Sequence, residues 1–181
     1  MSDSTAPHTG RYVVMGVSGA GKSAVGEAFA QAVGLRFVEG DKFHPPENVA
    51  RMASGIPLTD DDRRGWLAAI AQELREACDR GEGIVVTCSA LKRRYRDVLR
   101  GGAPDVRFIY LAGSRTLLAD RMSHRTGHFM PAALLDSQLE TLEPPDADEG
   151  AWTINIDAPV DAIVARLVTL VVALAFTPPG T

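Results

Sequence analysis

The stretch Gly16-Val17-Ser18-Gly19-Ala20-Gly21-Lys22-Ser23 fits the pattern G-x-x-x-x-G-K-[ST]. An apolar run, Tyr12–Met15, precedes it, and a helical pattern from Lys22 to Val33 follows. Glycines let such a loop curl so that its backbone N–H groups point at phosphate oxygens, and the following helix presents its N-terminus to the same anion. We therefore predict a phosphate loop that binds a nucleoside triphosphate, in which Lys22 reaches the β- and γ-phosphates and the Ser23 hydroxyl ligates Mg²⁺. The residues expected to bind the nucleotide here are Gly16, Ser18, Gly19, Ala20, Gly21, Lys22 and Ser23.

Short apolar runs alternate with helical patterns along the rest of the chain. The runs without clean polar alternation, which is typical of strands covered on both faces, are Tyr12–Met15, Leu35–Val38, Ile84–Cys88, Val106–Leu111 and Trp152–Ile156. Helices are expected over 22–33, from Asp60 to about Gly81, and over 91–100, 114–124, 131–142 and 160–175. This alternation predicts an α/β fold with three layers, α/β/α, around a five-stranded parallel sheet.

Length and composition restrict the class of protein. The chain has 181 residues, 45% of them hydrophobic, and a net charge of −4. We expect one domain over 11–176 with a short lid at about 122–135, a disordered tail over 1–10 and a C-terminal tail over 177–181. The acidic balance argues against a nucleic-acid partner. Asp161 and Arg166 interrupt the most apolar stretch, so a packed helix is favoured over a membrane segment. Two cysteines and no secretory signal favour the cytoplasm.

Charge is distributed unevenly along the chain. Residues 91–125 hold nine Lys/Arg and three Asp/Glu, whereas residues 136–161 hold eight Asp/Glu and no Lys/Arg. The basic segment is interpreted as a wall that handles anions, namely ATP phosphates and an acidic substrate. Sequence reasoning gives no account of the acidic segment.

The phosphate loop alone does not specify which reaction the protein carries out with the triphosphate. A GTPase would normally carry the guanine-reading Asn-Lys-x-Asp, which the chain lacks, and a mechanical ATPase would usually be larger. A small single-domain kinase fits the size best. A regulatory nucleotide-binding module without transfer is the alternative from another class of protein.

Polar residues after the second apolar run are candidates for the acceptor side, because ligands bind beyond the carboxyl ends of parallel strands. Asp41 follows that run by about three residues and would lie near the γ-phosphate if this strand neighboured the first. A carboxylate there can accept the proton of the acceptor hydroxyl or hold a water on Mg²⁺. A helix cap or turn residue is the alternative interpretation of Asp41.

Basic residues follow the third and fourth runs. Lys92 and Arg96 are four apart and so lie on one helix face, where they are candidates for contact with an anionic ligand. Arg121 and Arg125 precede a glycine-containing loop that resembles a lid, and Arg125 could neutralise charge on the transferred phosphoryl group. A plain helix end with favourable C-terminal cations is the alternative for this pair.

Several motifs together resemble the gluconokinases of the small phosphate-loop type, which are related to shikimate and adenylate kinases. The motifs are residues 15–23, Gly40-Asp41-x-x-His44-Pro45, residues 52–63 (MASGIPLTDDDR), residues 88–97 (CSALKRRYRD), Gly127-His128-Phe129 and residues 138–145 (QLETLEPP). The resemblance covers the chain from Tyr12 to about Leu174. It implies a nucleoside-kinase-like fold with a lid, ATP-dependent phosphorylation of D-gluconate at its terminal hydroxyl, Mg²⁺ and a homodimer. A kinase of another small hydroxy acid, such as shikimate, is the alternative.

The resemblance also implies roles for individual residues. Asp41 matches the carboxylate near the acceptor hydroxyl, Arg121 and Arg125 match the lid arginines, and the turn Asp157-Ala158-Pro159 falls where related kinases hold the adenine. Arg51 stands where the family often has Lys. Gluconate is a small anion with many hydroxyls, and the polar groups available for it besides Asp41 are His44, Arg51, Lys92, Arg96, His128 and Gln138.

Overall fold

The computed structural model describes residues 9–124 and 131–176. A single five-stranded parallel sheet lies at its centre, with the strand order β2-β3-β1-β4-β5. The strands are β1 (Arg11–Met15), β2 (Arg36–Val38), β3 (Ile84–Thr87), β4 (Arg107–Ala112) and β5 (Trp152–Asn155). All five correspond to the predicted runs, with ends that differ by about one residue.

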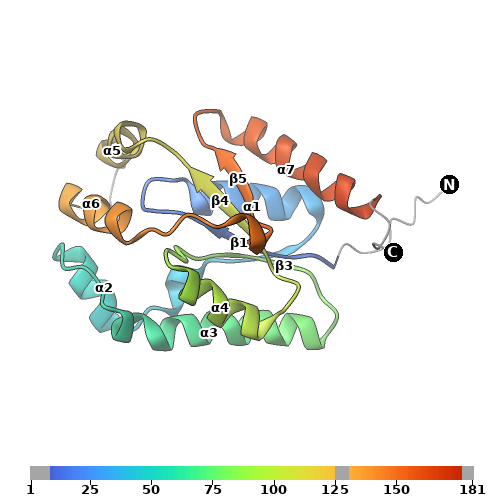
Figure 1. Ribbon diagram of the computed structural model, residues 1–181, viewed down its shortest axis with the longest axis horizontal. Coiled ribbons are helices and arrows are strands. Elements are labelled where there is room, and N and C mark those ends of the chain that lie inside the picture. The colour runs from blue at the N-terminus through green and yellow to red at the C-terminus, as the bar shows by residue number, and fades with distance from the viewer. Residues whose placement is uncertain (1–8, 125–130, 177–181) are drawn as a thin grey trace.

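Helices cover both faces of the sheet (Figure 1). They are α1 (Lys22–Val33), α2 (Pro46–Ala53), α3 (Asp60–Asp79), α4 (Arg93–Gly102), α5 (Arg115–Ser123), α6 (Ala132–Thr141) and α7 (Val160–Ala175), with short 3₁₀ turns η1 (Gly40–Phe43) and η2 (Ala147–Glu149). Helices α1 and α7 pack together on one face, and α3 and α4 pack together on the other. The predicted three-layer fold is confirmed, and α2 is the helix that sequence reasoning missed.

The central strand β1 explains why the phosphate loop is held firmly. Every residue of β1 is buried, and Val13 pairs with Val86 of β3 on one side and with Phe108 of β4 on the other. The loop that follows therefore starts from the middle of the sheet. Because β3 lies between β2 and β1, the second strand does not neighbour the first, and the condition given for placing Asp41 near the γ-phosphate is not met.

The start of α3 is fixed by a capping box. The Asp62 N–H donates to Thr59 Oγ1 at 3.2 Å, and the Thr59 N–H donates to Asp62 Oδ2 at 2.8 Å. Two backbone donors that a helix end leaves unpaired are satisfied in this way. A fixed N-terminus orients the first turn of α3, which brings Arg63 to the site described below.

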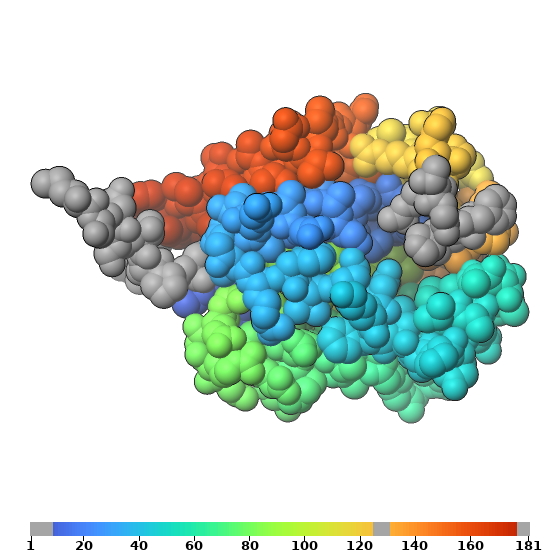
Figure 2. Space-filling model, turned by 180° about the vertical axis from the view of Figure 1, so that it is seen from behind, coloured from blue at the N-terminus to red at the C-terminus, as the bar shows by residue number. Residues whose placement is uncertain are grey.

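Helices α2, α5 and α6 gather at one end of the sheet, beside the phosphate loop (Figure 1). The space-filling view shows α2 and α5 on opposite sides of that end (Figure 2). Among the described residues, no helix is long and apolar enough to cross a membrane.

Candidate active site

The phosphate loop has the backbone that its sequence predicts. Gly19 and Gly21 have φ values of +82° and +87°, in the left-handed region that favours glycine. A side chain at Gly19 would also place its Cβ 2.9 Å from the Leu118 carbonyl oxygen of α5. Gly21 caps α1, and the Lys22 ammonium group donates to the Val17 carbonyl at 3.0 Å across the loop. This arrangement fits a phosphate group at the N-terminus of α1.

A carboxylate that sequence reasoning missed contacts the loop. The Ser23 hydroxyl donates to Glu39 Oε2 at 2.5 Å, and the Thr87 hydroxyl donates to the other oxygen of Glu39. Gly40 permits this approach, because a Cβ there would lie 1.9 Å from the Thr87 carbonyl oxygen. Hydroxyl and carboxylate oxygens are the ligands that Mg²⁺ prefers. Glu39 directly follows β2, which is the signal that could have identified it.

Asp41 faces a pocket beside the phosphate loop. Besides Asp41, the pocket is lined by Ser18, Lys22, His44, Met52, Leu58, Arg63, Ser89, Leu134 and Gln138. These residues come from the phosphate loop, from η1 and the helices α2, α3 and α6, and from the loops beside them. A carboxylate and the lysine of the phosphate loop therefore line one pocket together with hydrogen-bonding side chains.

His44 is held at this pocket by an aromatic neighbour. Its ring stacks on Trp66 with centroids 4.1 Å apart and planes inclined by 16°. The Trp66 indole N–H donates to the Gly40 carbonyl at 2.8 Å, which fixes the stacking partner. Burial lowers the pKa of His44 below its usual value, against the opposing charge of Asp41. The imidazole is therefore neutral at pH 7 and can both donate and accept a hydrogen bond.

Arg63 is the second residue that sequence reasoning missed. Its side chain is only 7% exposed, and its Nε is buried with no hydrogen-bond partner among the described residues. Nη2 makes a long contact of 3.4 Å to the Leu58 carbonyl. A buried guanidinium with an unused donor calls for an anionic partner. The signal was present, because Arg63 lies three and four residues before Trp66 and Leu67, on the apolar stripe of α3.

Gln138 joins α6 to the phosphate loop. Its side-chain oxygen accepts a hydrogen bond from the Ser18 backbone N–H at 2.7 Å. The predicted site residues Asp41, His44 and Gln138 are thus brought together at one pocket with Lys22.

Arg121 lies between the phosphate loop and the turn after β5. Its Nη2 donates to the Ile156 carbonyl at 2.6 Å, directly before Asp157-Ala158-Pro159, and its Nη1 would lie 3.8 Å from a Cβ at Gly21. The structure thus brings Arg121, this turn and the start of α1 to one side of the loop. The predicted residues Arg125 and His128 lie outside the described residues.

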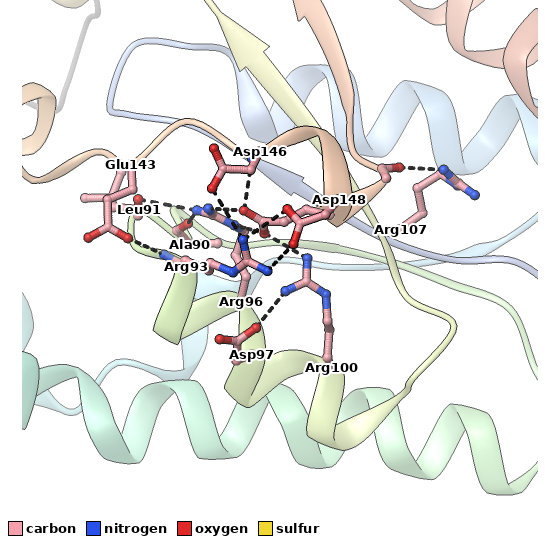
Figure 3. A network of polar contacts seen from close by, with 12 residues as sticks. Ala90, Leu91, Arg93, Arg96, Asp97, Arg100, Arg107, Glu143, Asp146 and Asp148 are labelled. Atoms are coloured by element: carbon pink, nitrogen blue, oxygen red, sulfur yellow. Dashed lines mark hydrogen bonds and ion pairs between the residues drawn. The ribbon is translucent and has the colours of Figure 1, made fainter.

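Arg96 does not belong to this pocket, and its assignment to the substrate was wrong. Its side chain is fully buried and forms a two-pronged ion pair with Glu149, with distances of 2.6 and 2.7 Å (Figure 3). Lys92 and Arg51 are not among the pocket-lining residues either. The Lys92 ammonium is 3.2 Å from Asp60, and the Arg51 guanidinium is 3.6 Å from Asp62, both in the first turn of α3. These ion pairs with Asp60 and Asp62 hold Lys92 and Arg51 away from the pocket.

The two oppositely charged segments pair with each other. Arg93 binds Asp146 and Asp148, Arg100 binds Glu149, and Arg115 binds Asp136. Figure 3 shows the part of this network around α4. The acidic residues of 136–161 thereby neutralise much of the basic segment, so the interpretation of that segment as an anion-handling wall is wrong for these arginines.

The parallel sheet, the phosphate loop and the pocket beside it that Asp41 and Lys22 line define a phosphate-loop kinase. Residues 18–143 match the family model described as shikimate kinase. The gluconokinase of Gluconobacter oxydans is 49% identical over 86% of this chain and 88% of its own length. The thermoresistant gluconokinase of Escherichia coli is 42% identical over 88% of this chain and 92% of its own. A solved gluconokinase from Sinorhizobium meliloti is 53% identical, with a TM-score of 0.83 over 93% of this chain and 97% of that one.

The chain belongs to the shikimate kinase family and, within it, to the gluconokinases.

Proposed function

We propose that the protein transfers the γ-phosphoryl group of ATP to the terminal 6-hydroxyl of D-gluconate, giving 6-phospho-D-gluconate and ADP. The observation that carries the proposal is the buried guanidinium of Arg63 in the same pocket as Asp41 and Lys22. The Arg63 guanidinium would bind a carboxylate at one end of a small substrate, while Asp41 accepts the proton of the hydroxyl at the other end. The gluconokinase relatives support this choice of acid.

The transfer needs a base and positive charge. Asp41 accepts the proton of the 6-hydroxyl as its oxygen attacks the γ-phosphorus. The bond from that phosphorus to the oxygen bridging the β- and γ-phosphates breaks, and ADP leaves with the electron pair. Lys22 stabilises the charge on the phosphate oxygens. Arg125, which lies outside the described residues, is proposed to do the same from the lid.

Mg²⁺ is proposed as the metal, and the residues present fit it. The Ser23 hydroxyl would ligate the ion, with the carboxylates of Glu39 and Asp41 nearby to bind its water ligands. Of these two, Glu39 is the one in contact with Ser23. When bound, the ion neutralises charge on the β- and γ-phosphates.

Other polar residues are proposed to contact gluconate or the nucleotide. His44 and Gln138 are proposed to bind gluconate hydroxyls from the pocket, and His128 from the lid. Arg51 and Lys92 would reach the substrate only by leaving Asp62 and Asp60. Arg121 is proposed to bind the nucleotide as a lid arginine, and the turn Asp157-Ala158-Pro159 is proposed to hold the adenine.

A coupled assay of ADP release tests the proposal. ATP, Mg²⁺ and the protein are mixed with D-gluconate, shikimate, other sugar acids and the uncharged sugar alcohol sorbitol. Gluconate-dependent release well above the other acceptors is the expected result. If ADP is released only with another acid, that acid is the substrate and gluconate is not. ATP binding without release for any acceptor would favour the regulatory module.

We also propose that the protein forms a homodimer and acts in the cytoplasm. Apolar side chains of Val172, Leu174 and Phe176, which are 49, 41 and 82% exposed at the end of α7, support a second copy as a partner. The use of ATP supports the cytoplasm. Light scattering after size-exclusion chromatography measures the mass of the assembly.

A further inference from the structure

Arg96 connects two parts of the chain that lie far apart in sequence. One side of its guanidinium binds Glu149 in η2 through Nε and Nη2. Its remaining nitrogen, Nη1, donates to the Ala90 carbonyl at 2.9 Å and, at a longer 3.4 Å, to that of Leu91 (Figure 3). A planar guanidinium can serve a carboxylate and a carbonyl at the same time, which a lysine ammonium group cannot do with the same geometry.

The carbonyl that Arg96 holds belongs to an unfavourable turn. Ala90 has a φ of +45° and is the described non-glycine residue with a positive φ. It is fully buried, in the loop between β3 and α4. A non-glycine residue in this region is strained, and it persists only where its surroundings hold it. Arg96 supplies one such restraint, and the Glu143 N–H, which donates to the Leu91 carbonyl at 2.7 Å, supplies another.

The other side of the same turn faces the active site. Ser89, the residue before Ala90, lines the pocket with Asp41 and Arg63. Its carbonyl accepts a hydrogen bond at 3.3 Å from the N–H of Gly16, where the phosphate loop begins. A change in the conformation of Ala90 would therefore move both a wall of the pocket and a support of the phosphate loop.

We propose that Arg96, oriented by Glu149, is a positioning residue for phosphoryl transfer: it holds Ala90 in its left-handed conformation and so places Ser89 at the acceptor pocket. The proposal rests on the proposed function. It also explains why an arginine at the buried face of α4 reaches back to the preceding loop instead of only pairing with Glu149.

The test compares Arg96→Lys with Arg100→Lys. Arg100 donates to the same Glu149 at 2.8 Å and has no contact with Ala90 or Leu91 among the described residues, so it is a matched control for loss of the ion network. Arg96→Lys should raise the KM for gluconate by about tenfold, because small misplacements in a reacting site have large effects. The KM for ATP should rise less, because within the described part of the chain a single hydrogen bond of 3.3 Å links this turn to the phosphate loop, whereas Ser89 itself lines the acceptor pocket. Arg100→Lys should leave both constants near the wild-type values.

Amide hydrogen exchange gives a second readout that does not depend on the substrate. Faster exchange at Gly16 and at residues 89–91 is expected in Arg96→Lys and not in Arg100→Lys. If the wild type fails to phosphorylate gluconate, the proposed function is wrong, and the exchange measurement still decides the positioning role.

Rescue by glycine separates positioning from simple stabilisation. Glycine adopts a φ of +45° without the cost that alanine carries. Adding Ala90→Gly to Arg96→Lys should therefore lower the raised KM for gluconate part of the way back to the wild-type value. If both lysine variants lower the unfolding temperature alike, with unchanged KM values and unchanged exchange at residues 89–91, Arg96 is only structural and the proposal is overturned. Should Arg96→Lys not fold, Glu149→Gln is measured in its place. A raised KM for gluconate with faster exchange at residues 89–91 would support the proposal, and unchanged values of both would overturn it.

Discussion

The hydroxyl of Ser23 lies 2.5 Å from a carboxylate oxygen of Glu39, so the first turn of α1 is bonded to the residue that follows β2. Thr87, at the end of β3, holds the other carboxylate oxygen. The ends of two strands and the phosphate loop therefore meet at one carboxylate. This is the environment in which the proposed Mg²⁺ would bind.

Replacing Glu39 by Gln should weaken the dependence of activity on Mg²⁺. Loss of a group that orients a metal or its ligands typically costs about 10- to 100-fold in metal affinity, so the Mg²⁺ concentration for half-maximal rate should rise within that range. Titration of the rate with MgCl₂ at saturating ATP and gluconate measures it. Glu47→Gln, on the exposed first turn of α2, is the control. An unchanged Mg²⁺ titration for Glu39→Gln would remove this residue from the metal site.

Replacing Arg63 by Gln should raise the KM for gluconate with little effect on the KM for ATP. Hydrogen bonds to charged groups contribute about 1.5–3 kcal/mol, which corresponds to an increase of roughly 10- to 150-fold. Stability should change little or increase, because the Nε of Arg63 is buried without a partner among the described residues.

The control for this prediction is the neighbouring arginine. Arg64 is 82% exposed and binds Asp61 in the same helical turn, so Arg64→Gln should leave the KM for gluconate unchanged. The preference for gluconate over sorbitol should fall in Arg63→Gln only. If that preference persists, another group binds the carboxylate.

Asparagine in place of Asp41 should lower kcat by about 10²- to 10⁴-fold, since an amide cannot accept the hydroxyl proton. Calorimetric titration with a non-hydrolysable ATP analogue should give an affinity close to that of the wild type. Asp79→Asn, exposed at the far end of α3, controls for loss of one negative charge. A kcat near the wild-type value in Asp41→Asn would assign the base to another residue.

The local elements of this fold were predictable because local patterns carry them. Continuous apolar runs identified all five strands, and Thr59 with Asp62 identified the start of α3. Helix α2 begins at Pro46 directly after Pro45, and its eight residues bury only Asn48, so it offered no apolar stripe to recognise. The order of the strands depends on long-range packing, which no local pattern specifies.

The site residues also differ in whether a local pattern or long-range packing determines their role. Lys22 and Ser23 follow from a contiguous motif, but the roles of charged residues depend on which partner the fold brings to them. Lys92 is the N-cap residue of α4, and Arg96 lies four residues further on in the helix. Arg96 nevertheless pairs with Glu149, which is 53 residues away, and Lys92 pairs with Asp60. The spacing predicted one shared helix face for the two residues, but it could not specify these partners.

Stability should fall as acid protonates Glu149. Hydrogen bonds from Arg96 and then Arg100 lower the pKa of Glu149 from its ordinary value near 4.5 to about 2. As the pH falls below about 4.5, the unfolded chain takes up a proton that folded Glu149 still excludes. The stabilisation from this group is therefore complete above about pH 4.5 and is lost progressively towards pH 2.

Chemical denaturation measured from pH 6 to pH 2 checks this sign. Glu149→Gln should be less stable than the wild type at pH 6, because Arg96 stays buried without its counter-charge. The difference between the two proteins should then shrink as the pH falls from about 4.5 towards 2, since the wild type alone loses the ion pair. Glu82→Gln, which removes an exposed partner of Arg80, should run parallel to the wild type. A difference between wild type and Glu149→Gln that stays constant over this range would show that Glu149 does not titrate with a depressed pKa.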